Sequence, residues 1–330
     1  GNPAQTGSLS LVMLNTAGQD NIDVVTKESV RIYHNDVDVT EAYTIDVQEG
    51  NLTVSKKTIT LTSEGASKQY DGLPLEKPNV DLTNAVLADT DQFEITPKAT
   101  GKVTDVTGSE GVLNTITPVK IIDKGTQEDR TSNYDIKYVE GKLIITKAPA
   151  AENALTLSDK TVVYNAKIQH LDNATATVNN SVIEYRVNLT RAGEWSTTMP
   201  VFTEAGTYTI EARATNDNYE TSYATATLTI KKRPVLITGS RRTITYDGTT
   251  QNVSGYSTQT QDDQKEEGLI TGHRVRNVTA SASGTNAGTH EGTITNSSEV
   301  QITNNLNTVN YTNNYNITTK PGAIVIEPKE

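Results

Sequence analysis

The residues best able to do chemistry are four histidines, and their spacing limits what they can bind. They lie far apart in the sequence, at His34, His170, His273 and His290. A zinc site usually has at least two ligands within a few residues of each other. No histidine has such a neighbour, and the chain contains no cysteine. We therefore expect these histidines to be structural or exposed, with no metal and no catalytic role.

Two groups of carboxylates are candidates for calcium. The first group is Asp36, Asp38 and Glu41, and the second is Asp89, Asp91 and Glu94. Calcium takes six to eight oxygen ligands on a bent loop. Neither group has the glycine-containing spacing of a calcium loop. Solvated loops are the favoured interpretation, and calcium binding stays open as the alternative.

Groups for covalent catalysis are also missing. Without cysteine, and without a Gly-x-Ser-x-Gly sequence, acyl transfer has no nucleophile signature. No glycine-rich loop of the kind that holds phosphate is present. The sequence therefore predicts no enzyme, no cofactor, and no catalytic, cofactor-binding or metal site. One covalent alternative stays open, an intramolecular amide between Lys and Asn side chains near the repeat ends, which lowers the mass by one ammonia for each bond.

Charge and hydropathy exclude two classes of partner. The net charge is −11 at pH 7, and an acidic surface repels a phosphate backbone, so nucleic acid is not expected as a ligand. No run of 18 apolar residues exists, so this segment is expected not to enter a membrane. The chain is expected to be a monomer whose repeats contact their neighbours in the same chain.

Strands are expected almost throughout. Thr, Val, Ile and Tyr suit half-buried strands, and apolar and polar residues alternate, as where Leu228 and Ile230 follow Thr227 and Thr229. One short helix is expected around residues 82–89. The fold class is all-β, with tandem small β-domains of the Ig-like sandwich type or a related β-rich repeat.

An internal repeat defines the organisation of the chain. Tyr43, Tyr134 and Tyr315 are each followed after seven residues by a glycine, and aliphatic residues lie two and four positions beyond it. A fourth copy beginning at Tyr219 has no glycine. This pattern predicts a strand, a turn relieved by glycine, and a final strand facing a core.

The beginning of the repeat is also marked, by a tyrosine turn. The three turns are Tyr70-Asp71-Gly72, Tyr164-Asn165-Ala166 and Tyr246-Asp247-Gly248. They predict repeats at 57–147, 148–231 and 232–330, with a partial or divergent repeat at 1–56. The links are short, which predicts an elongated, semi-rigid rod with a separate core in each repeat. Strands of about ten residues give about 35 Å per repeat and about 140 Å for four.

Three further positions carry specific expectations. Tyr208 follows an Ala-Gly-Thr turn, as in a tyrosine corner, where the hydroxyl binds a nearby backbone group. Trp195 is expected to pack, and stacking on a sugar is the alternative. Residues 261–267 are polar and charged and are expected to form a mobile loop.

These residues together resemble repeats of bacterial cell-surface proteins. Residues 57–147 and 232–330 resemble the MBG-type repeat, and 148–231 resembles a related Ig-like surface repeat. For the MBG-type repeat the resemblance is carried by the tyrosine turns, by Asn133-Tyr134-Asp135-Ile136 with Glu140-Gly141-Lys142-Leu143, and by Gly268-Leu269-Ile270-Thr271-Gly272-His273 with Asn314-Tyr315-Asn316-Ile317. For 148–231 it is carried by Trp195-Ser196-Thr197-Thr198, Ala205-Gly206-Thr207-Tyr208 and Ala214-Thr215-Asn216-Asp217-Asn218-Tyr219.

The resemblance covers about five-sixths of the chain and implies an extracellular location, either on the bacterial cell surface in association with the cell wall or secreted. It supplies no catalytic residues. It favours a stalk or spacer that presents a distal domain. The alternative is an adhesin-like module whose loops bind a host glycan or glycoprotein, mucin or matrix.

Overall fold

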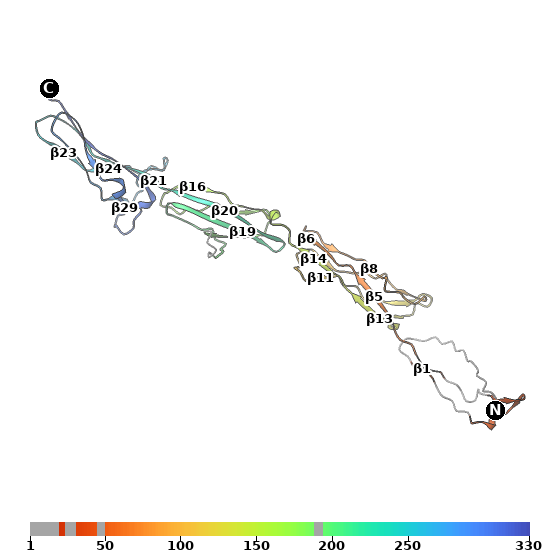
Figure 1. The fold of residues 1–330 in the computed structure, drawn as a ribbon. Coiled ribbons are helices and arrows are strands. Elements are labelled where there is room, and N and C mark those ends of the chain that lie inside the picture. The colour runs from red at the N-terminus through yellow and green to blue at the C-terminus, as the bar shows by residue number, and fades with distance from the viewer. Residues whose placement is uncertain (1–19, 24–30, 45–49, 188–193) are drawn as a thin grey trace. The chain divides into compact units, whose positions relative to one another are not determined.

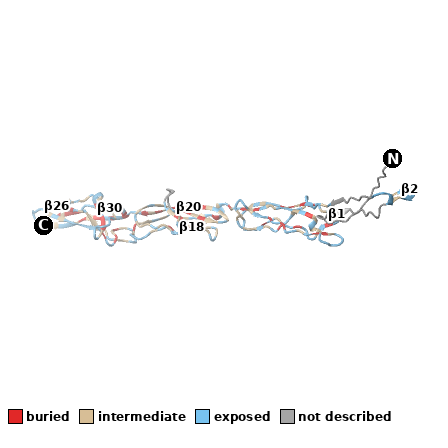
Figure 2. Cartoon of the chain, turned by 90° about the horizontal axis from the view of Figure 1, so that it is seen from below, coloured by how far each residue is buried: buried red, intermediate tan, exposed pale blue. Residues whose placement is uncertain are grey.

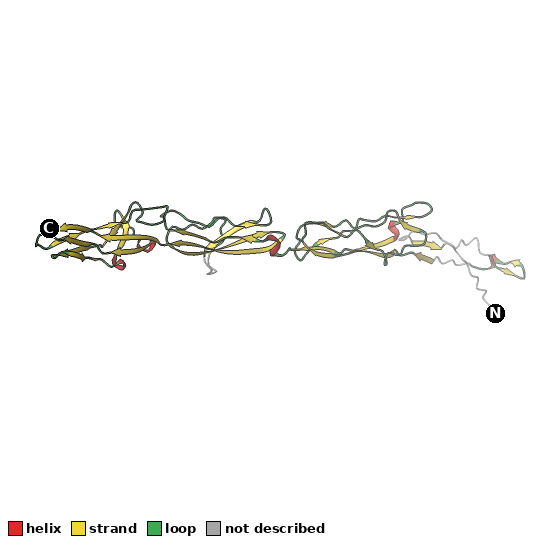
Figure 3. Cartoon of the chain, turned by 90° about the horizontal axis from the view of Figure 1, so that it is seen from above, coloured by secondary structure: helices red, strands yellow, loops and turns green. Residues whose placement is uncertain are grey.

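The computed structural model describes residues 20–23, 31–44, 50–187 and 194–330, and these residues form strands with only short 3₁₀ turns between them (Figures 1 and 3). The all-β prediction is confirmed. Two compact units are present, residues 1–148 and 149–330. Each unit contains two of the predicted repeats. The bounds of the individual repeats stay predictions. Among the described residues, none of the helical segments has the length and apolar character needed to cross a bilayer.

The first unit begins with two strand pairs. β1 (Asp20–Asp23) runs antiparallel to β4 (Gly50–Thr53), and β2 (Tyr33–His34) forms a hairpin with β3 (Val37–Asp38). The 3₁₀ turn η2 (Thr40–Ala42) follows β3.

Residues 57–146 form small sheets built around two parallel pairs. β5 (Lys57–Ser63) pairs parallel with β13 (Tyr134–Val139), and β6 (Ala66–Gln69) pairs parallel with β14 (Lys142–Thr146). The remaining elements are β7 (Leu75–Glu76), β8 (Val80–Asp81), β9 (Asp91–Phe93), β10 (Lys102–Val103), β11 (Val112–Leu113), β12 (Ile121–Asp123) and η3 (Thr131–Asn133). β8 and β11 complete the two three-stranded sheets, while β7–β10 and β9–β12 form separate pairs.

Residues 233–327 repeat this arrangement. β21 (Arg233–Gly239) pairs parallel with β30 (Tyr315–Lys320), and β22 (Arg241–Thr245) pairs parallel with β31 (Ala323–Glu327). The remaining elements are β23 (Gln251–Ser254), β24 (Tyr256–Thr258), β25 (His273–Arg276), β26 (Ala280–Gly284), β27 (Gly288–Glu291), β28 (Thr293–Ile294), η5 (Ser297–Glu299), β29 (Gln301–Asn304) and η6 (Thr312–Asn314). The same two parallel pairs in both segments support the internal repeat seen in the sequence. The segments differ in that β23, β26 and β28 form a third three-stranded sheet, whereas residues 57–146 have only the pair β7–β10.

Residues 149–231 differ by having one larger sheet. Its strand order is β16-β20-β19-β18. The strands are β16 (Lys160–Val163), β18 (Val182–Val187), β19 (Gly206–Asn216) and β20 (Tyr219–Lys231), beside η4 (Ala150–Asn153) and the pair β15 (Leu155–Thr156) and β17 (Thr175–Ala176). The alternation predicted at residues 227–230 is confirmed, because Leu228 and Ile230 are buried.

The repeated glycine has a different role from the predicted turn. Gly141 and Gly322 lie where the chain leaves β13 or β30 for the next sheet. A Cβ on Gly141 would lie 2.3 Å from the backbone nitrogen of Gly65, and one on Gly322 would lie 2.0 Å from the carbonyl oxygen of Ser240. Two backbones therefore cross in contact, which only glycine permits. The copy without glycine makes no crossing, and β20 runs unbroken for 13 residues.

The cores are small, and Figure 2 shows buried residues as short stretches within largely exposed or half-buried strands. Residues 57–146 have two apolar clusters, one around Ile59 and Leu61 and one around Leu143 and Ile145. In residues 149–330 the largest cluster contains side chains of both segments. Its buried members are Tyr164, Leu171, Ala174, Tyr185, Ile210, Ala212, Ala226, Leu228, Ile230, Val235, Ile270, Ile302 and Tyr315. The expectation of a separate core in every repeat is therefore wrong for 148–231, whose core is shared with 232–330. Residues 232–330 also have a smaller cluster of their own around Ile324 and Ile326.

The helix expected around residues 82–89 is absent, and the chain there is irregular. The side chain of Asp81 accepts hydrogen bonds from the backbone nitrogen and hydroxyl of Thr83, which starts a turn instead of a helix. The backbone nitrogen of Thr60 on β5 then binds the carbonyl of Asn84. Tertiary pairing with a strand overrides weak helix propensity here.

A second repeated element was missed in the sequence. Asp38, Asp129 and Asn310 each accept a hydrogen bond from the backbone nitrogen of a threonine two residues later. Each threonine opens a 3₁₀ turn that ends at Tyr43, Tyr134 or Tyr315. The spacing Asp/Asn-x-Thr-x-x-Tyr was visible in the sequence. It shows that residues 31–44 contain the same element as residues 57–146 and residues 233–327.

Candidate functional site

The most elaborate arrangement of polar groups lies within residues 149–330, where β20 passes into β21. Only Lys232 separates the two strands. Tyr164 directly follows β16, and Glu204 and Ala205 directly precede β19. They meet the turn η6, the strand β30 and the start of β25. We call this set of contacts the junction.

Asn314 forms the polar part of the junction. Its side chain is buried, and its Oδ1 accepts a hydrogen bond of 2.6 Å from the backbone nitrogen of Ala205. Its Nδ2 donates to the Oε2 atom of Glu204. The amide therefore binds two consecutive residues of the other β-domain. A buried amide loses free energy when it has no partner, so these bonds fix the relative position of the two domains.

Four rings form the rest of the junction. The ring centroid of Tyr164 lies 5.7 Å from that of Tyr315, edge to face, and 6.3 Å from that of His273. His273 stacks on Tyr311 with 4.0 Å between centroids and an angle of 3°. Its Nδ1 atom lies 2.7 Å from the hydroxyl of Tyr315. Such aromatic packing adds stability beyond the area it buries.

Burial shifts the pKa values of three of these rings. It raises the pKa of Tyr315 to about 12 and also raises the pKa of Tyr164, because the phenolate form would lose its hydration. Burial lowers the pKa of His273 below its ordinary value, and the negative charge of Glu204 opposes that effect. At neutral pH the shifts therefore favour the uncharged forms of Tyr164, Tyr315 and His273.

Arg233 lies beside the junction and is 1% exposed. Its Nε donates to the carbonyl of Gly268 at 2.9 Å, and its Nη2 donates to the carbonyls of Asp262 and Glu267 and to Oδ1 of Asp263. The loop 261–267 is held by these bonds, so the expectation of a mobile loop is not met. The sequence hid this role because Arg233 follows two lysines and looks like part of a charged link.

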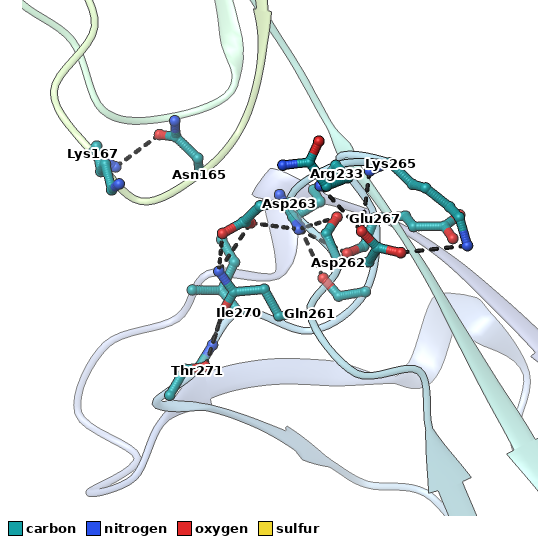
Figure 4. Close-up of polar contacts among 12 residues, drawn as sticks. Asn165, Lys167, Arg233, Gln261, Asp262, Asp263, Lys265, Glu267, Ile270 and Thr271 are labelled. Carbon is teal, nitrogen blue, oxygen red and sulfur yellow. Dashed lines mark hydrogen bonds and ion pairs between the residues drawn. The ribbon is translucent and has the colours of Figure 1, made fainter.

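A polar hollow of about 200 Å³ adjoins Arg233 (Figure 4). Asn165 and Lys167 line one side, and Gln261, Asp263 and Glu266 line the other, with Val163 as the apolar part. The side chain of Asn165 is held by the backbone nitrogen of Lys167 at 3.0 Å and by Nε2 of Gln169 at 2.9 Å. The hollow thus has fixed planar polar groups, and its two positive and two negative charges balance.

Trp195 packs on the outer face of the sheet, as predicted. The guanidinium carbons of Arg186 and Arg213 lie 4.5 and 4.4 Å from its ring centroid. Arg186 pairs with Glu211 at 2.5 Å, and Arg213 pairs with Glu184 at 2.8 Å. The ring covers two cross-strand ion pairs, which is a structural role. The hydroxyl of Tyr208 donates to the carbonyl of Glu204 at 2.8 Å, which confirms the tyrosine corner.

The predicted calcium candidates are not assembled as sites. Asp38 accepts from Thr40, and Asp91 accepts a hydrogen bond of 2.7 Å from the hydroxyl of Tyr134. Glu94 pairs with Lys120 at 2.7 Å. Within the described ranges, no three His, Asp or Glu side chains lie close enough together to hold a metal ion.

The other histidines are likewise separate. His34 and His170 are exposed, and Nε2 of His290 lies 2.7 Å from the carbonyl of Asn286. The buried Asn114 and Asn153 use their side-chain bonds on backbone groups and on Ser181. They therefore offer no geometry in favour of the Lys–Asn amide.

The fold and the junction define a β-rich repeat protein with tandem small β-domains. Residues 153–234 match the family model described as the MBG domain. This match confirms the resemblance to MBG-type repeats. It falls on the segment for which the sequence favoured a related Ig-like repeat. The match does not cover residues 57–147 or extend beyond residue 234, so the MBG-type assignment of 57–147 and 232–330 stays a prediction.

Comparison with other proteins gives weak likenesses. No curated protein matches the chain. Among solved structures, immunoglobulin domains 1–4 of Sidekick-1 are 11% identical with a TM-score of 0.25, over 82% of this chain and 74% of that one. Drosophila N-cadherin EC1-3 is 10% identical with a TM-score of 0.21, over 83% and 98%. Human CDH23 EC21-23 is 8% identical with a TM-score of 0.24, over 81% and 98%. At these scores the likenesses carry no conclusion.

Proposed function

We propose that this chain is a structural spacer in an extracellular bacterial protein, on the cell surface or secreted, where it holds a distal domain at a fixed distance. The observation that carries the proposal is the junction. One residue links β20 to β21, and a shared apolar cluster and the Asn314 bonds join the two β-domains. A spacer must resist bending, and such a joint leaves little freedom for it.

The location is supported by the resemblance to surface-protein repeats and by the MBG match at 153–234. We propose no enzymatic activity, because the polar groups of the junction are spent on one another. A spacer of this type needs neither a cofactor nor a metal.

Small-angle X-ray scattering of the full chain tests the spacer. We expect an elongated particle, and we expect the Asn314→Ala variant to give a broader distribution of dimensions because it loses both bonds to the other domain. Asn313→Ala changes the exposed neighbour on the same turn and serves as the control. A compact particle for the unaltered chain argues against a spacer.

A second function, adhesion to a glycan, is favoured by the polar hollow. Its planar amide and carboxylate groups match the donors and acceptors of sugar hydroxyls. Its balanced charge favours a neutral sugar, and its volume suits a single sugar residue. Val163 offers an apolar surface to one face of such a ring.

A glycan array and a mucin pull-down test adhesion. If the hollow binds sugar, Asn165→Ala and Lys167→Ala should each abolish the signal. His170→Ala, on the same loop but not among the lining residues, should retain it. A chain that binds neither glycans nor mucin is not an adhesive module.

A further inference from the structure

Position 273 is a place where residues 57–146 and residues 233–327 build the same contact from different chemistry. In residues 57–146, the hydroxyl of Tyr134 accepts from the backbone nitrogen of Ala88 at 3.0 Å and donates to Oδ2 of Asp91. In residues 233–327, the backbone nitrogen of Ile270 lies 3.3 Å from the hydroxyl oxygen of Tyr315, which contacts Nδ1 of His273. The carboxylate of one copy is a histidine in the other.

The two copies also differ in what surrounds them. The Asp91 copy packs within its own segment. The His273 copy packs against Tyr164 of the preceding β-domain, within the shared cluster. Because the hydroxyl oxygen of Tyr315 already accepts from Ile270, its proton is available for Nδ1. The neutral ring with its proton on Nε2 therefore satisfies every group in the contact.

We propose that His273 makes the junction between the two β-domains of residues 149–330 sensitive to acid, so that protonation of its ring loosens the contact with Tyr164 and the segment at Glu204 and Ala205. A protonated Nδ1 must donate to Tyr315, which forces the phenol proton away into a site that is 3% exposed. The same proton places a positive charge inside a stack of rings.

The charged and titratable groups around the ring of His273 determine how readily it is protonated. From β30 and η6 come Tyr315 and Tyr311, and from the end of β16 comes Tyr164. Glu204, before β19, attracts the protonated ring. Arg233 on β21 acts on the neighbouring Tyr315. β29, which pairs with β25, supplies Gln301–Asn304 and no titratable side chain.

Burial outweighs Glu204 at this site, so the pKa of His273 is lowered from 6.5. A folded state that binds its proton less readily than the unfolded state loses stability as pH falls. The junction is therefore intact above pH 6.5, and the loss grows as pH falls from there through the lower pKa of the folded state.

The test is amide exchange in the full chain at pH 7.5 and 5.5, corrected for intrinsic rates. The amide of Ala205 reports the junction because it donates to Asn314. We expect it to lose protection several-fold at the lower pH, and about tenfold is the limit for one proton whose unfolded pKa is 6.5. The loss should be less than about twofold in His273→Asn, whose amide oxygen accepts from Tyr315 but does not titrate. His170→Asn, an exposed histidine, should behave as the unaltered chain.

Equal losses in the unaltered chain and in His273→Asn overturn the proposal. If His273→Asn does not fold, His273→Asp copies the contact of Asp91 and replaces it. The NMR titration of the four histidine rings gives an independent result in the unaltered chain. If the ring of His273 titrates at the same pH as that of His170, protonation costs the junction nothing and the proposal fails.

Discussion

Replacing Arg233 by methionine tests how the buried guanidinium stabilises residues 232–330. Methionine keeps the unbranched apolar stem and removes the charge. The change removes the guanidinium donor from four acceptors, the carbonyls of Asp262, Glu267 and Gly268 and one oxygen of Asp263. The carbonyls of Asp262 and Glu267 keep a backbone hydrogen bond from each other's nitrogen. Asp263 is largely exposed and recovers water, whereas Gly268 is buried.

The expected loss of stability follows from how well each acceptor recovers another partner. A stranded buried carbonyl costs about 1–3 kcal/mol, and lost bonds from a charged donor cost about as much again. Removal of a buried charge returns part of this, because the guanidinium no longer has to be desolvated. We therefore expect Arg233→Met to lower the free energy of unfolding by about 3 kcal/mol.

Two measurements in the full chain check this value. Amide exchange over residues 261–269 reports the loop directly. Guanidinium-induced unfolding followed by the fluorescence of Trp195, the single tryptophan, reports the neighbouring domain that shares the apolar cluster. Arg242→Met, at an exposed position on β22, should change stability by less than about 0.5 kcal/mol. A loss below about 1 kcal/mol with unchanged exchange of the loop would refute the reasoning.

Three further outcomes are expected. Gly322→Ala should lower the free energy of unfolding by about 3 kcal/mol, measured by amide exchange of β30 and β31, because its Cβ would meet the backbone of Ser240. Gly248→Ala has open space around its Cβ but a φ of +79°, and it should cost about 1 kcal/mol. Equal losses would show that the backbone crossing is not the reason for glycine at position 322. Ala166→Gly should raise the stability of the Trp195 domain by about 0.5 kcal/mol, since Ala166 has a φ of +58°; a loss would contradict this. Calcium at about 5 mM should leave the Tm unchanged, because Asp38, Asp91 and Glu94 already have partners. A clear rise would revive the calcium alternative.

Much of the fold could be predicted because its signals are local. Alternating residues such as Thr229 and Ile230 determine which face of a strand is buried. The sequence placed a break between two strands at Gly141 correctly, but the reason for glycine there is a backbone crossing and not a turn. The crossing depends on a distant partner, Gly65, that no local pattern identifies.

The junction was harder to predict because its members look like members of separate repeats. Tyr164 and Tyr315 occupy repeated positions, so each was assigned to its own core. Asn314 is one asparagine in a polar run, and only the approach of Glu204 gives it a role. Long-range pairing of this kind leaves no periodic signal in the sequence.

The bonds of Asn314 also bear on how such chains can be rearranged. Repeat proteins diversify by exchanging modules at their boundaries, and the boundary near Lys232 looks suitable for that. A recombinant that kept residues 232–330 behind a foreign module would still contain the buried amide without Glu204 and Ala205 to receive it. The last two β-domains are therefore expected to be inherited, duplicated and transplanted as a pair.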